Sequence, residues 1–300
     1  MTATVLVFGR GGQLARELAR IGAPTGLELA FAGREDFDLS THDPASLIAA
    51  RAPDAVINAS AYTAVDKAET EPAAAFRLNR DAPAALARAC AARDIPFVHV
   101  STDYVFDGTK AEPYVEEDPV NPMGVYGRSK AEGEAGVLAA GGRAAILRTS
   151  WVFGAFGSNF VKTMLGLAAT RDELAVVADQ IGRPTWAKDL ADGALRATTA
   201  LLDRDAGAEG LFHLTGSGEA VSWADFAEAI FEESARRGGP SAAVRRITTA
   251  QFAADRPGMA PRPANSRLDC SKLVGALNWA TPDWRESLAA CCSELETNPT

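Results

Sequence analysis

The sequence predicts an α/β protein in which helices cover both faces of a doubly wound parallel sheet, with a smaller lobe at the C-terminal end. Over the first half of the chain, strand-like apolar runs alternate with alanine-rich helical segments, as repeated βαβ units do. The alternation loosens after Trp151, so residues 1–150 and 151–300 are expected to form two parts. A chain of 300 residues that is 47% hydrophobic is large enough to bury such a core.

The elements expected in the first part alternate in type, beginning with a strand. They lie at Val5–Phe8, Gln13–Ile21, Leu27–Ala32, Ala45–Arg51, Ala55–Ala59, Ala73–Arg93 and Pro96–Ser101, followed by a helix at Lys130–Ala140 and a strand at Ala144–Thr149. The strands are short apolar runs, and the helices are longer and rich in alanine.

The second part is expected to mix sheet and lobe. Its elements are a helix at Phe160–Ala169, a strand near Leu174–Val177, a helix at Ala187–Leu202, a strand at Gly210–Leu214 and an amphipathic helix at Trp223–Arg237. A Gly-Gly-Pro run at 238–240 ends the last helix. We expect segments near 174–214 to return and complete the sheet, and the rest to form a lobe that binds substrate.

Composition excludes several kinds of partner. A formal net charge of −9 argues against nucleic acid, because proteins that bind it usually carry a basic face. The longest apolar runs fall far short of the roughly 20 residues that cross a bilayer, and no basic leader precedes the first strand. The four cysteines show neither metal-ligand nor disulfide spacing. We therefore expect a cytoplasmic monomer or homodimer that takes a small-molecule substrate, with no membrane and no nucleic-acid partner.

A glycine-rich turn follows the first expected strand and opens the first helix. Its residues are Gly9, Gly11, Gly12, Gln13, Leu14 and Ala15, in the pattern G-x-x-G-x-x-A. Gly9 permits the tight turn, and Gly12 lets the backbone approach a pyrophosphate. The N–H groups of the helix N-terminus then face the phosphates. A glycine cluster alone could be an ordinary turn, but its place between strand and helix predicts a dinucleotide site of the Rossmann type.

The ends of the second and third strands bear on the choice of dinucleotide. Where an acidic residue would bind the ribose of NAD, the sequence has Arg34, whose guanidinium could pair with a 2′-phosphate. This favours NADPH without excluding NADH; the alternative is that Arg34 is a solvated surface residue. Asp38 and Leu39 stand where such folds contact adenine. Small residues that would let the backbone lie against a cofactor follow the third strand: Ala59, Ser60 and Ala61.

A threonine, a tyrosine and a lysine follow in the order that a reductase needs. Thr102 follows the strand at Pro96–Ser101, and Tyr126 precedes Lys130 by one helical turn. The charge of Lys130, with an oxidised nicotinamide, would bring the phenolate of Tyr126 nearer to neutral pH. Tyr126 could then act as general acid while a hydride reaches the carbonyl, which Thr102 would polarise. Each residue has a plain structural alternative, but their order after a dinucleotide motif indicates catalysis.

Longer blocks around these residues resemble the dTDP-4-dehydrorhamnose reductase family of extended short-chain dehydrogenases. Besides the glycine turn, the matching blocks are residues 58–69, 101–108, 125–130, 148–154, 159–160, 183–185 and 262–268. They span nearly the whole chain. The resemblance implies reduction of the 4-keto group of dTDP-4-dehydro-L-rhamnose by NADPH or NADH.

The resemblance also implies roles for individual residues. Thr102, Tyr126 and Lys130 correspond to the catalytic residues of the family. The cofactor contacts correspond to Gly11, Gly12, Gln13, Leu14, Asp38, Leu39, Ala59, Ser60, Ala61 and Tyr62, with Tyr126 and Lys130 beside them. Asp103, Tyr104 and Trp151, together with Thr102, match the sugar-nucleotide contacts. Trp151 has a second interpretation as a core aromatic after a strand.

One position departs from the family. Some members bind magnesium through glutamates at a dimer interface, and Glu17 matches the first of these. Lys188, however, stands where a second carboxylate is expected. The sequence therefore argues against a magnesium site and against that mode of dimerisation.

Two alternatives remain open at the level of sequence. The chain could be another nucleotide-sugar 4-ketoreductase or epimerase, with the same Tyr126 and Lys130 but a different sugar pocket. Dehydration is less favoured, because a dehydratase usually places an acidic pair beside its threonine, whereas here Thr102 is followed by Asp103 and then Tyr104. It could also be a non-catalytic regulatory subunit that keeps the nucleotide site, since fold does not by itself establish turnover.

Overall fold

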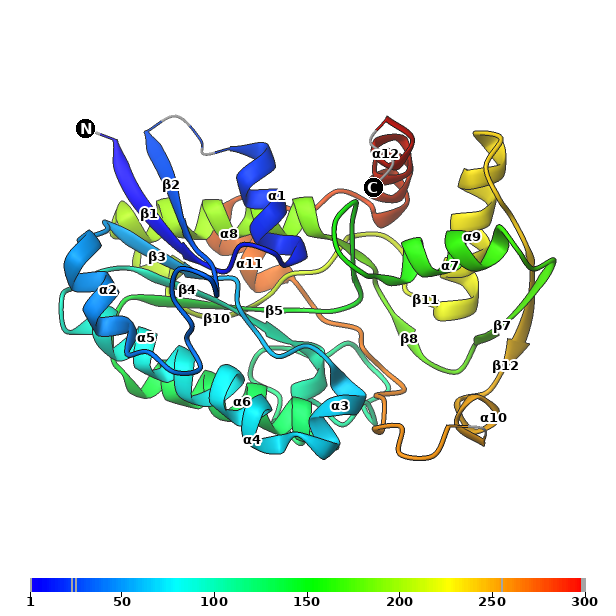
Figure 1. The fold of residues 1–300 in the computed structure, drawn as a ribbon, viewed down its shortest axis with the longest axis horizontal. Helices are drawn as coiled ribbons and strands as arrows, with labels where there is room; N and C mark the ends of the chain where they lie inside the picture. Colours follow the sequence, from blue (N-terminus) through cyan, green and yellow to red (C-terminus); the bar gives the residue numbers. More distant parts are fainter. Residues whose placement is uncertain (1, 23, 25, 255, 298–300) are drawn as a thin grey trace.

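The protein is described here by a computed structural model that covers residues 2–22, 24, 26–254 and 256–297. Its centre is a six-stranded parallel sheet in the order β10-β5-β4-β3-β1-β2 (Figure 1). The strands are β1 (Ala3–Phe8), β2 (Leu27–Ala32), β3 (Ala55–Asn58), β4 (Phe97–Thr102), β5 (Ala144–Thr149) and β10 (Gly210–His213). The predicted doubly wound α/β class is confirmed. The strand order reverses between β1 and β3, which is where open α/β sheets bind their ligands.

Helices cover both faces of this sheet (Figure 1). On one face lie α1 (Gln13–Ile21), α8 (Ala187–Leu202) and α11 (Ser271–Leu277), and on the other lie α2 (Pro44–Arg51), α5 (Ala82–Ala91) and α6 (Val125–Ala139). Alternate side chains of β1 enter separate cores, Val5 and Val7 on the first face and Leu6 and Phe8 on the second. A strand segment buried on both faces is expected to be apolar, and Val5–Phe8 of β1 are.

The second part of the chain forms a lobe beside one end of the sheet (Figure 1). It contains α7 (Phe160–Ala168), α9 (Trp223–Arg236), α12 (Trp284–Thr297) and a pair of parallel strands, β7 (Glu173–Val177) and β12 (Ala243–Ile247). Phe226 lies at the centre of the lobe core, and its ring contacts the rings of Phe153, Phe160 and Trp284. The lobe therefore has a core of its own.

Short elements complete the fold. They are β6 (Val152–Phe153) paired with β9 (Thr185–Trp186), β8 (Ile181–Gly182) paired with β11 (Val221–Ser222), helices α3 (Val65–Thr70), α4 (Pro72–Phe76) and α10 (Thr249–Ala254), a π-helical turn at Arg77–Asp81, and 3-10 turns at Asp103–Val105 and Ala206–Ala208. None of the described helices combines the length and the apolar character needed to cross a bilayer.

One expectation is confirmed with a local irregularity, and one needs correction. The helix expected at Ala73–Arg93 is present as a continuous helical run from Pro72 to Ala91 that contains a π-helical turn, in which the side chain of Asn79 hydrogen-bonds the backbone of Tyr62. The strand expected near Leu174–Val177 does not complete the sheet, because it pairs with β12 in the lobe. That pairing was hidden because the residues of β12 are exposed or half-buried, so the strand carries no strong apolar pattern.

Other late segments do return to the sheet. β10 adds its edge strand beside β5, and α8 packs across one face. Leu273 of α11 enters the same core. The division into a dinucleotide-binding part at 1–150 and a substrate lobe at 151–300 is kept as a proposal, with these returning segments assigned to the first part; residues 298–300 lie outside the described residues.

Candidate active site

A cleft runs along the edge of the sheet where β1, β3, β4 and β5 end. It contains two adjoining cavities, which we name the outer cavity, of about 480 Å³, and the inner cavity, of about 620 Å³. The outer cavity lies between the glycine turn and the end of β2, and the inner cavity extends from the same turn to Tyr126 and Trp151. Gly11, Gly12 and residues 59–61 line both. One elongated ligand could therefore occupy the two cavities together.

The glycine turn fits the phosphate groups of such a ligand. Gly9 has φ +118°, and a Cβ on it would lie 3.1 Å from Ser60 Oγ and 3.2 Å from the carbonyl carbon of Ala59. A side chain at this position would therefore be strained and crowded. Gly12 caps α1 without a side-chain hydrogen bond, so the N–H groups of the first turn stay available to an anion. The turn is suited to a pyrophosphate.

The outer cavity carries two guanidinium groups. Arg34 is exposed and lines the cavity with Asp38 and Leu39. Arg10, within the glycine turn, also lines it, and it pairs with Asp36 at 2.9 Å. The sequence reasoning did not single out Arg10, although its position inside the G-x-x-G pattern was a usable signal. Either arginine could meet a 2′-phosphate.

Thr102 and Asp103 lie buried at the end of β4. The Thr102 hydroxyl donates to Asp103 Oδ1 at 3.0 Å and accepts from the backbone N–H of Tyr104 at 3.2 Å. Burial raises the pKa of Asp103 to about 6. Asp103 Oδ2 is buried and meets no hydrogen-bond partner at bonding geometry among the described residues, although Ser266 is near enough to lower the pKa of the carboxyl, so Oδ2 is a candidate acceptor for a ligand.

Tyr126 stands at the start of α6, close to this pair. Its ring meets that of Tyr104 edge-on, with centroids 5.5 Å apart. The next residue must be glycine, because a Cβ on Gly127 would lie 2.1 Å from the Tyr104 carbonyl oxygen. Burial raises the pKa of Tyr126 to about 12, and Asp103 acts in the same direction. The surrounding protein groups therefore favour a protonated phenol at neutral pH, and the expected shift of the phenolate towards neutrality, which also depends on an oxidised nicotinamide, stays a prediction.

Lys130 lies one turn further along α6 and is 2% exposed. Its amine donates to the Val100 carbonyl at 2.6 Å and lies 3.4 Å from His99 Nε2. Burial lowers its pKa to about 8, and Glu134 acts in the opposite direction. Glu134 itself is held by Arg148 of β5 at 2.7 Å. Lys130 can therefore lose its proton not far above neutral pH.

Trp151 closes the inner cavity from the lobe side. Its backbone has φ +51°, an uncommon conformation for a residue with a bulky side chain. Its indole stacks on that of Trp223, with centroids 3.6 Å apart and planes inclined by 12°. Gly182 admits the ring, since a Cβ there would lie 2.6 Å from Trp151 Cε2. Trp151 is thus held as a wall of the cavity, and its partner Trp223 was not anticipated.

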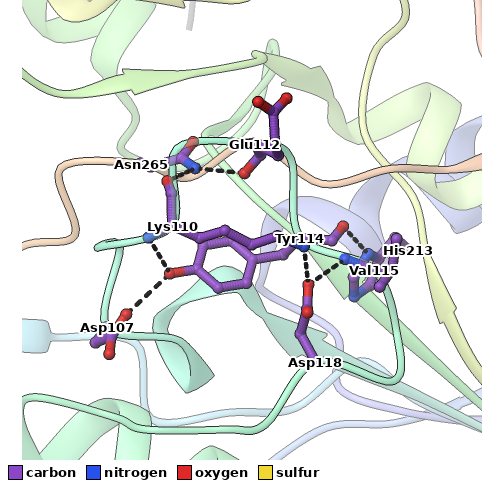
Figure 2. A network of polar contacts seen from close by, with 8 residues as sticks. All are labelled: Asp107, Lys110, Glu112, Tyr114, Val115, Asp118, His213 and Asn265. Atoms are coloured by element: carbon purple, nitrogen blue, oxygen red, sulfur yellow. Dashed lines mark hydrogen bonds and ion pairs between the residues drawn. The ribbon is translucent and has the colours of Figure 1, made fainter.

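A network of polar contacts holds the loop after β4 between Asp107 and Asp118 (Figure 2). Tyr114 donates its hydroxyl to Asp107 at 2.9 Å, and its ring stacks on Phe106 at 4.1 Å. Its carbonyl lies 3.1 Å from Nδ1 of buried His213. Asn265 donates to the carbonyls of Lys110 and Glu112, which ties the loop to the segment that precedes α11. The loop is therefore part of the rigid scaffold of the cleft.

One residue expected at the site, Tyr62, lines neither cavity, although it packs against the same apolar cluster as Tyr126. Its hydroxyl donates to Glu71 at 2.8 Å, and its N–H donates to Asn79. All other predicted site residues line at least one of the two cavities. In the outer cavity they are Gly9, Gly11, Gly12, Arg34, Asp38, Leu39, Ala59, Ser60 and Ala61, and the inner cavity adds Gln13, Leu14, Thr102, Asp103, Tyr104, Tyr126, Lys130 and Trp151.

The residues at the suggested magnesium position do not fit a divalent cation. Glu17 is fully buried and accepts from Arg20 at 2.7 Å. Arg20 also pairs with Glu294 at 3.0 Å, and Lys188 lies 3.7 Å from the same carboxylate. Magnesium prefers a shell of oxygens, whereas here Arg20 bridges the two carboxylates and Lys188 adds a second cation, which leaves Glu17 Oε1 as a single buried oxygen without a partner among the described residues. Within the described ranges no group of three or more histidine, cysteine or acidic residues could hold a metal.

A parallel sheet with a glycine turn after its first strand and a Tyr-x-x-x-Lys pair at its edge is typical of short-chain dehydrogenases and reductases. The chain belongs to the family described as the RmlD substrate binding domain, whose sequence profile matches residues 3–297. It is 48% identical to a dTDP-4-dehydrorhamnose reductase of Sinorhizobium fredii over 94% of both chains. It is 45% identical to that of Burkholderia thailandensis over 97% of this chain and 98% of the relative.

A solved structure agrees with these sequence relatives. The dTDP-4-dehydrorhamnose reductase of Bacillus anthracis in complex with NADP superimposes with a TM-score of 0.88 and 31% identity, covering 98% of this chain and 100% of the other. The family resemblance inferred from the sequence is therefore confirmed.

Proposed function

We propose that this protein reduces the 4-keto group of dTDP-4-dehydro-L-rhamnose to give dTDP-L-rhamnose, with NADPH or NADH as reductant. The observation that carries the proposal is the meeting of Thr102, Tyr126 and Lys130 in one cavity beside the glycine turn. The proposal is supported by the match of this chain to dTDP-4-dehydrorhamnose reductases over nearly its whole length. A bound nicotinamide supplies the hydride. The glycine turn would hold its pyrophosphate, and Arg34 or Arg10 would meet the 2′-phosphate.

Tyr126 is the proposed proton donor. With a pKa raised to about 12 it is protonated at neutral pH, which is the form that a reduction consumes. When it gives its proton to the keto oxygen, the phenolate left behind needs a nearby positive charge. Lys130 on the same helix face would supply that charge in its protonated form, and afterwards Tyr126 regains a proton from solvent or through Lys130.

Thr102 and Asp103 are proposed to orient the sugar. The single hydroxyl hydrogen of Thr102 is given to Asp103, so polarising the keto oxygen requires it to turn away from that carboxylate. The unpartnered Oδ2 of Asp103 is placed to accept from a sugar hydroxyl. Tyr104 and Trp151 would add apolar walls against the sugar nucleotide. Together these groups would fix the face of the ketone that the hydride reaches.

The test is a panel of substrates, with the oxidation of the reduced cofactor measured for each one. We expect rapid oxidation of NADPH with dTDP-4-dehydro-L-rhamnose, and slower oxidation with UDP- and GDP-linked 4-keto sugars. Preference for another member of the panel would assign the chain to a different nucleotide-sugar ketoreductase. Binding of NADPH without oxidation by any of them would contradict the proposal and favour a regulatory subunit.

A further inference from the structure

The amine of Lys130 lies at the end of a buried chain of polar groups that begins at Asn58 of β3 and passes through His99 of β4. His99 of β4 is 0% exposed and sits opposite Asn58 of β3 in the sheet register. Asn58 Nδ2 lies 3.1 Å from His99 Nδ1, and His99 Nε2 lies 3.4 Å from Lys130 Nζ. The backbone N–H of Ser60 donates to Asn58 Oδ1 at 3.0 Å. None of these contacts belongs to the proposed proton transfer itself.

The hydrogen positions along this chain follow from its first contact. Because Asn58 Oδ1 accepts from Ser60, the other end of the amide must be the NH₂ group, which donates to His99 Nδ1. Nδ1 then carries no hydrogen. A neutral imidazole in that state has its hydrogen on Nε2, and this N–H points at the Lys130 amine.

An ammonium group cannot accept this hydrogen, but a neutral amine can. Neutral Lys130 would accept from His99 Nε2–H and still donate to the Val100 carbonyl, so every member of the chain is satisfied. A protonated Lys130 would put two donors face to face. To avoid this contact, His99 would have to adopt its other tautomer and the Asn58 amide would have to reverse. The NH₂ group of Asn58 would then face the Ser60 N–H, again donor against donor.

Resting on the proposed function of Lys130, we propose that His99 is a positioning residue: its imidazole, oriented by Asn58, hydrogen-bonds the Lys130 amine in its neutral form and thereby sets the pH at which Lys130 takes up its proton. The charge of the catalytic lysine is thus coupled to a side chain that touches neither substrate nor cofactor. Through Ser60 the chain also reaches the backbone that lines both cavities.

The other charged groups near Lys130 are accounted for. Glu134 lies on the same helix and favours the charged lysine, but it is paired with Arg148 of β5. Tyr126 keeps its proton. Burial, with a contribution from Lys130, keeps the pKa of His99 well below its usual value, so the ring stays neutral and its tautomer is the variable.

Ring nitrogen NMR of protein labelled with ¹⁵N-histidine tests the arrangement without substrate or cofactor. The chain has three histidines, and the His99 signals are assigned by their loss in His99→Phe. Above the ionisation of Lys130 we expect Nε2 protonated and Nδ1 unprotonated, and a tautomer change without ring ionisation as the pH falls. An Nδ1–H tautomer at high pH, or a doubly protonated ring, would overturn the proposal whether or not the proposed reaction is correct.

The pH dependence of kcat/KM tests the consequence. In His99→Phe the alkaline limb, where Lys130 loses its proton, should move up by about one pH unit, as expected for losing one hydrogen bond to the neutral amine. His99→Gln should move the limb in the same direction with a smaller loss of turnover, because its amide can serve either charge state of Lys130. His213→Phe removes another buried imidazole, whose Nδ1 lies against the Tyr114 carbonyl, and should leave the limb in place (Figure 2). A uniform loss of activity at every pH in both His99 variants would reduce His99 to a packing residue.

Discussion

The outer and inner cavities adjoin, yet they are built in different ways. The outer cavity presents its charged groups to solvent: Arg34 is exposed, and the pair between Arg10 and Asp36 is about half exposed on each side. The inner cavity buries its charged groups, and Asp103 and Lys130 are 3% and 2% exposed. The same kinds of side chain therefore work in two different dielectric settings.

The difference decides how much each contact can do. Solvent and salt screen the exposed pairs, so a single arginine adjusts affinity by a modest factor. Burial in the inner cavity instead changes the protonation equilibrium of each group: it moves the pKa of Tyr126 to about 12, that of Lys130 to about 8 and that of Asp103 to about 6. Substitutions in the inner cavity should change turnover strongly, and those in the outer cavity should change cofactor affinity weakly.

The largest effect is expected for Tyr126→Phe. Removing the proton donor should lower kcat at least about 100-fold, while the ring still packs against Tyr104 and NADPH binding hardly changes. Steady-state kinetics and fluorescence titration with NADPH measure the two quantities. Tyr114→Phe removes the same group from a tyrosine that lines neither cavity and should lower turnover far less. A near-normal kcat in Tyr126→Phe would remove Tyr126 from the proposed mechanism.

An intermediate effect is expected for Gly127→Ala. The new Cβ would lie 2.1 Å from the Tyr104 carbonyl oxygen, so α6 must move away and carry Tyr126 with it. We expect about 1–3 kcal/mol of lost stability and roughly tenfold lower kcat. Gly166→Ala, in α7 with nothing within 4 Å of its Cβ, is the matched control and should be neutral or slightly stabilising. Thermal unfolding and kinetics compare the two; equal behaviour would show that the contact is not restrictive.

How far the sequence predicts each region follows from the same physics. The glycine turn, Thr102, Tyr126 and Lys130 lie at strand ends or within one helical turn, so local spacing indicates them. The central strands are mostly buried and mostly apolar, with a few polar residues such as Asn58, His99 and Arg148 among them, so their apolar runs are recognisable. In the C-terminal lobe the helices α7 and α9 were predicted from local pattern, but the strand pairing was not: β12 shows no apolar run, and its partner β7 lies far away in sequence.

The same limit explains the missed site residues. Trp223 and His99 act through a partner that is distant in the chain, the first stacking on Trp151 and the second contacting Lys130. One histidine in an apolar strand was the available signal for His99, and it has a plain interpretation as a buried polar residue. Arg10 could have been found, because the glycine pattern already places it beside the cofactor.

A smaller effect is expected for the arginines of the outer cavity. Arg34→Ala should raise the KM for NADPH by up to about tenfold and leave the KM for NADH nearly unchanged, because NADH lacks the 2′-phosphate. Arg10→Ala tests the competing interpretation that Arg10 reads the phosphate once it leaves Asp36. Parallel kinetics with both cofactors distinguish them. Equal effects on NADPH and NADH would show that the substituted arginine does not contact the phosphate, and in low salt any selective effect should grow.

No effect is expected from removing magnesium. Glu17, which matches the first of the family's magnesium ligands, is bridged by Arg20 to Glu294, and Lys188, at the second ligand position, adds a further cation. A divalent ion would have to displace both cations and would meet one carboxylate that is fully buried. Burial also raises the pKa of Glu17, so its affinity for a metal falls further as the pH drops.

Dialysis against EDTA is the direct measurement. Activity and the oligomeric state, followed by size-exclusion chromatography, should be the same with EDTA and with millimolar Mg²⁺. Lys188→Glu sharpens the comparison, because it removes a cation and adds a carboxylate at the same exposed position: the three carboxylates should then gain a measurable dependence of melting temperature on Mg²⁺ that the parent lacks. Loss of activity in the dialysed parent, restored by the ion, would show that other oxygens complete a metal site despite Lys188.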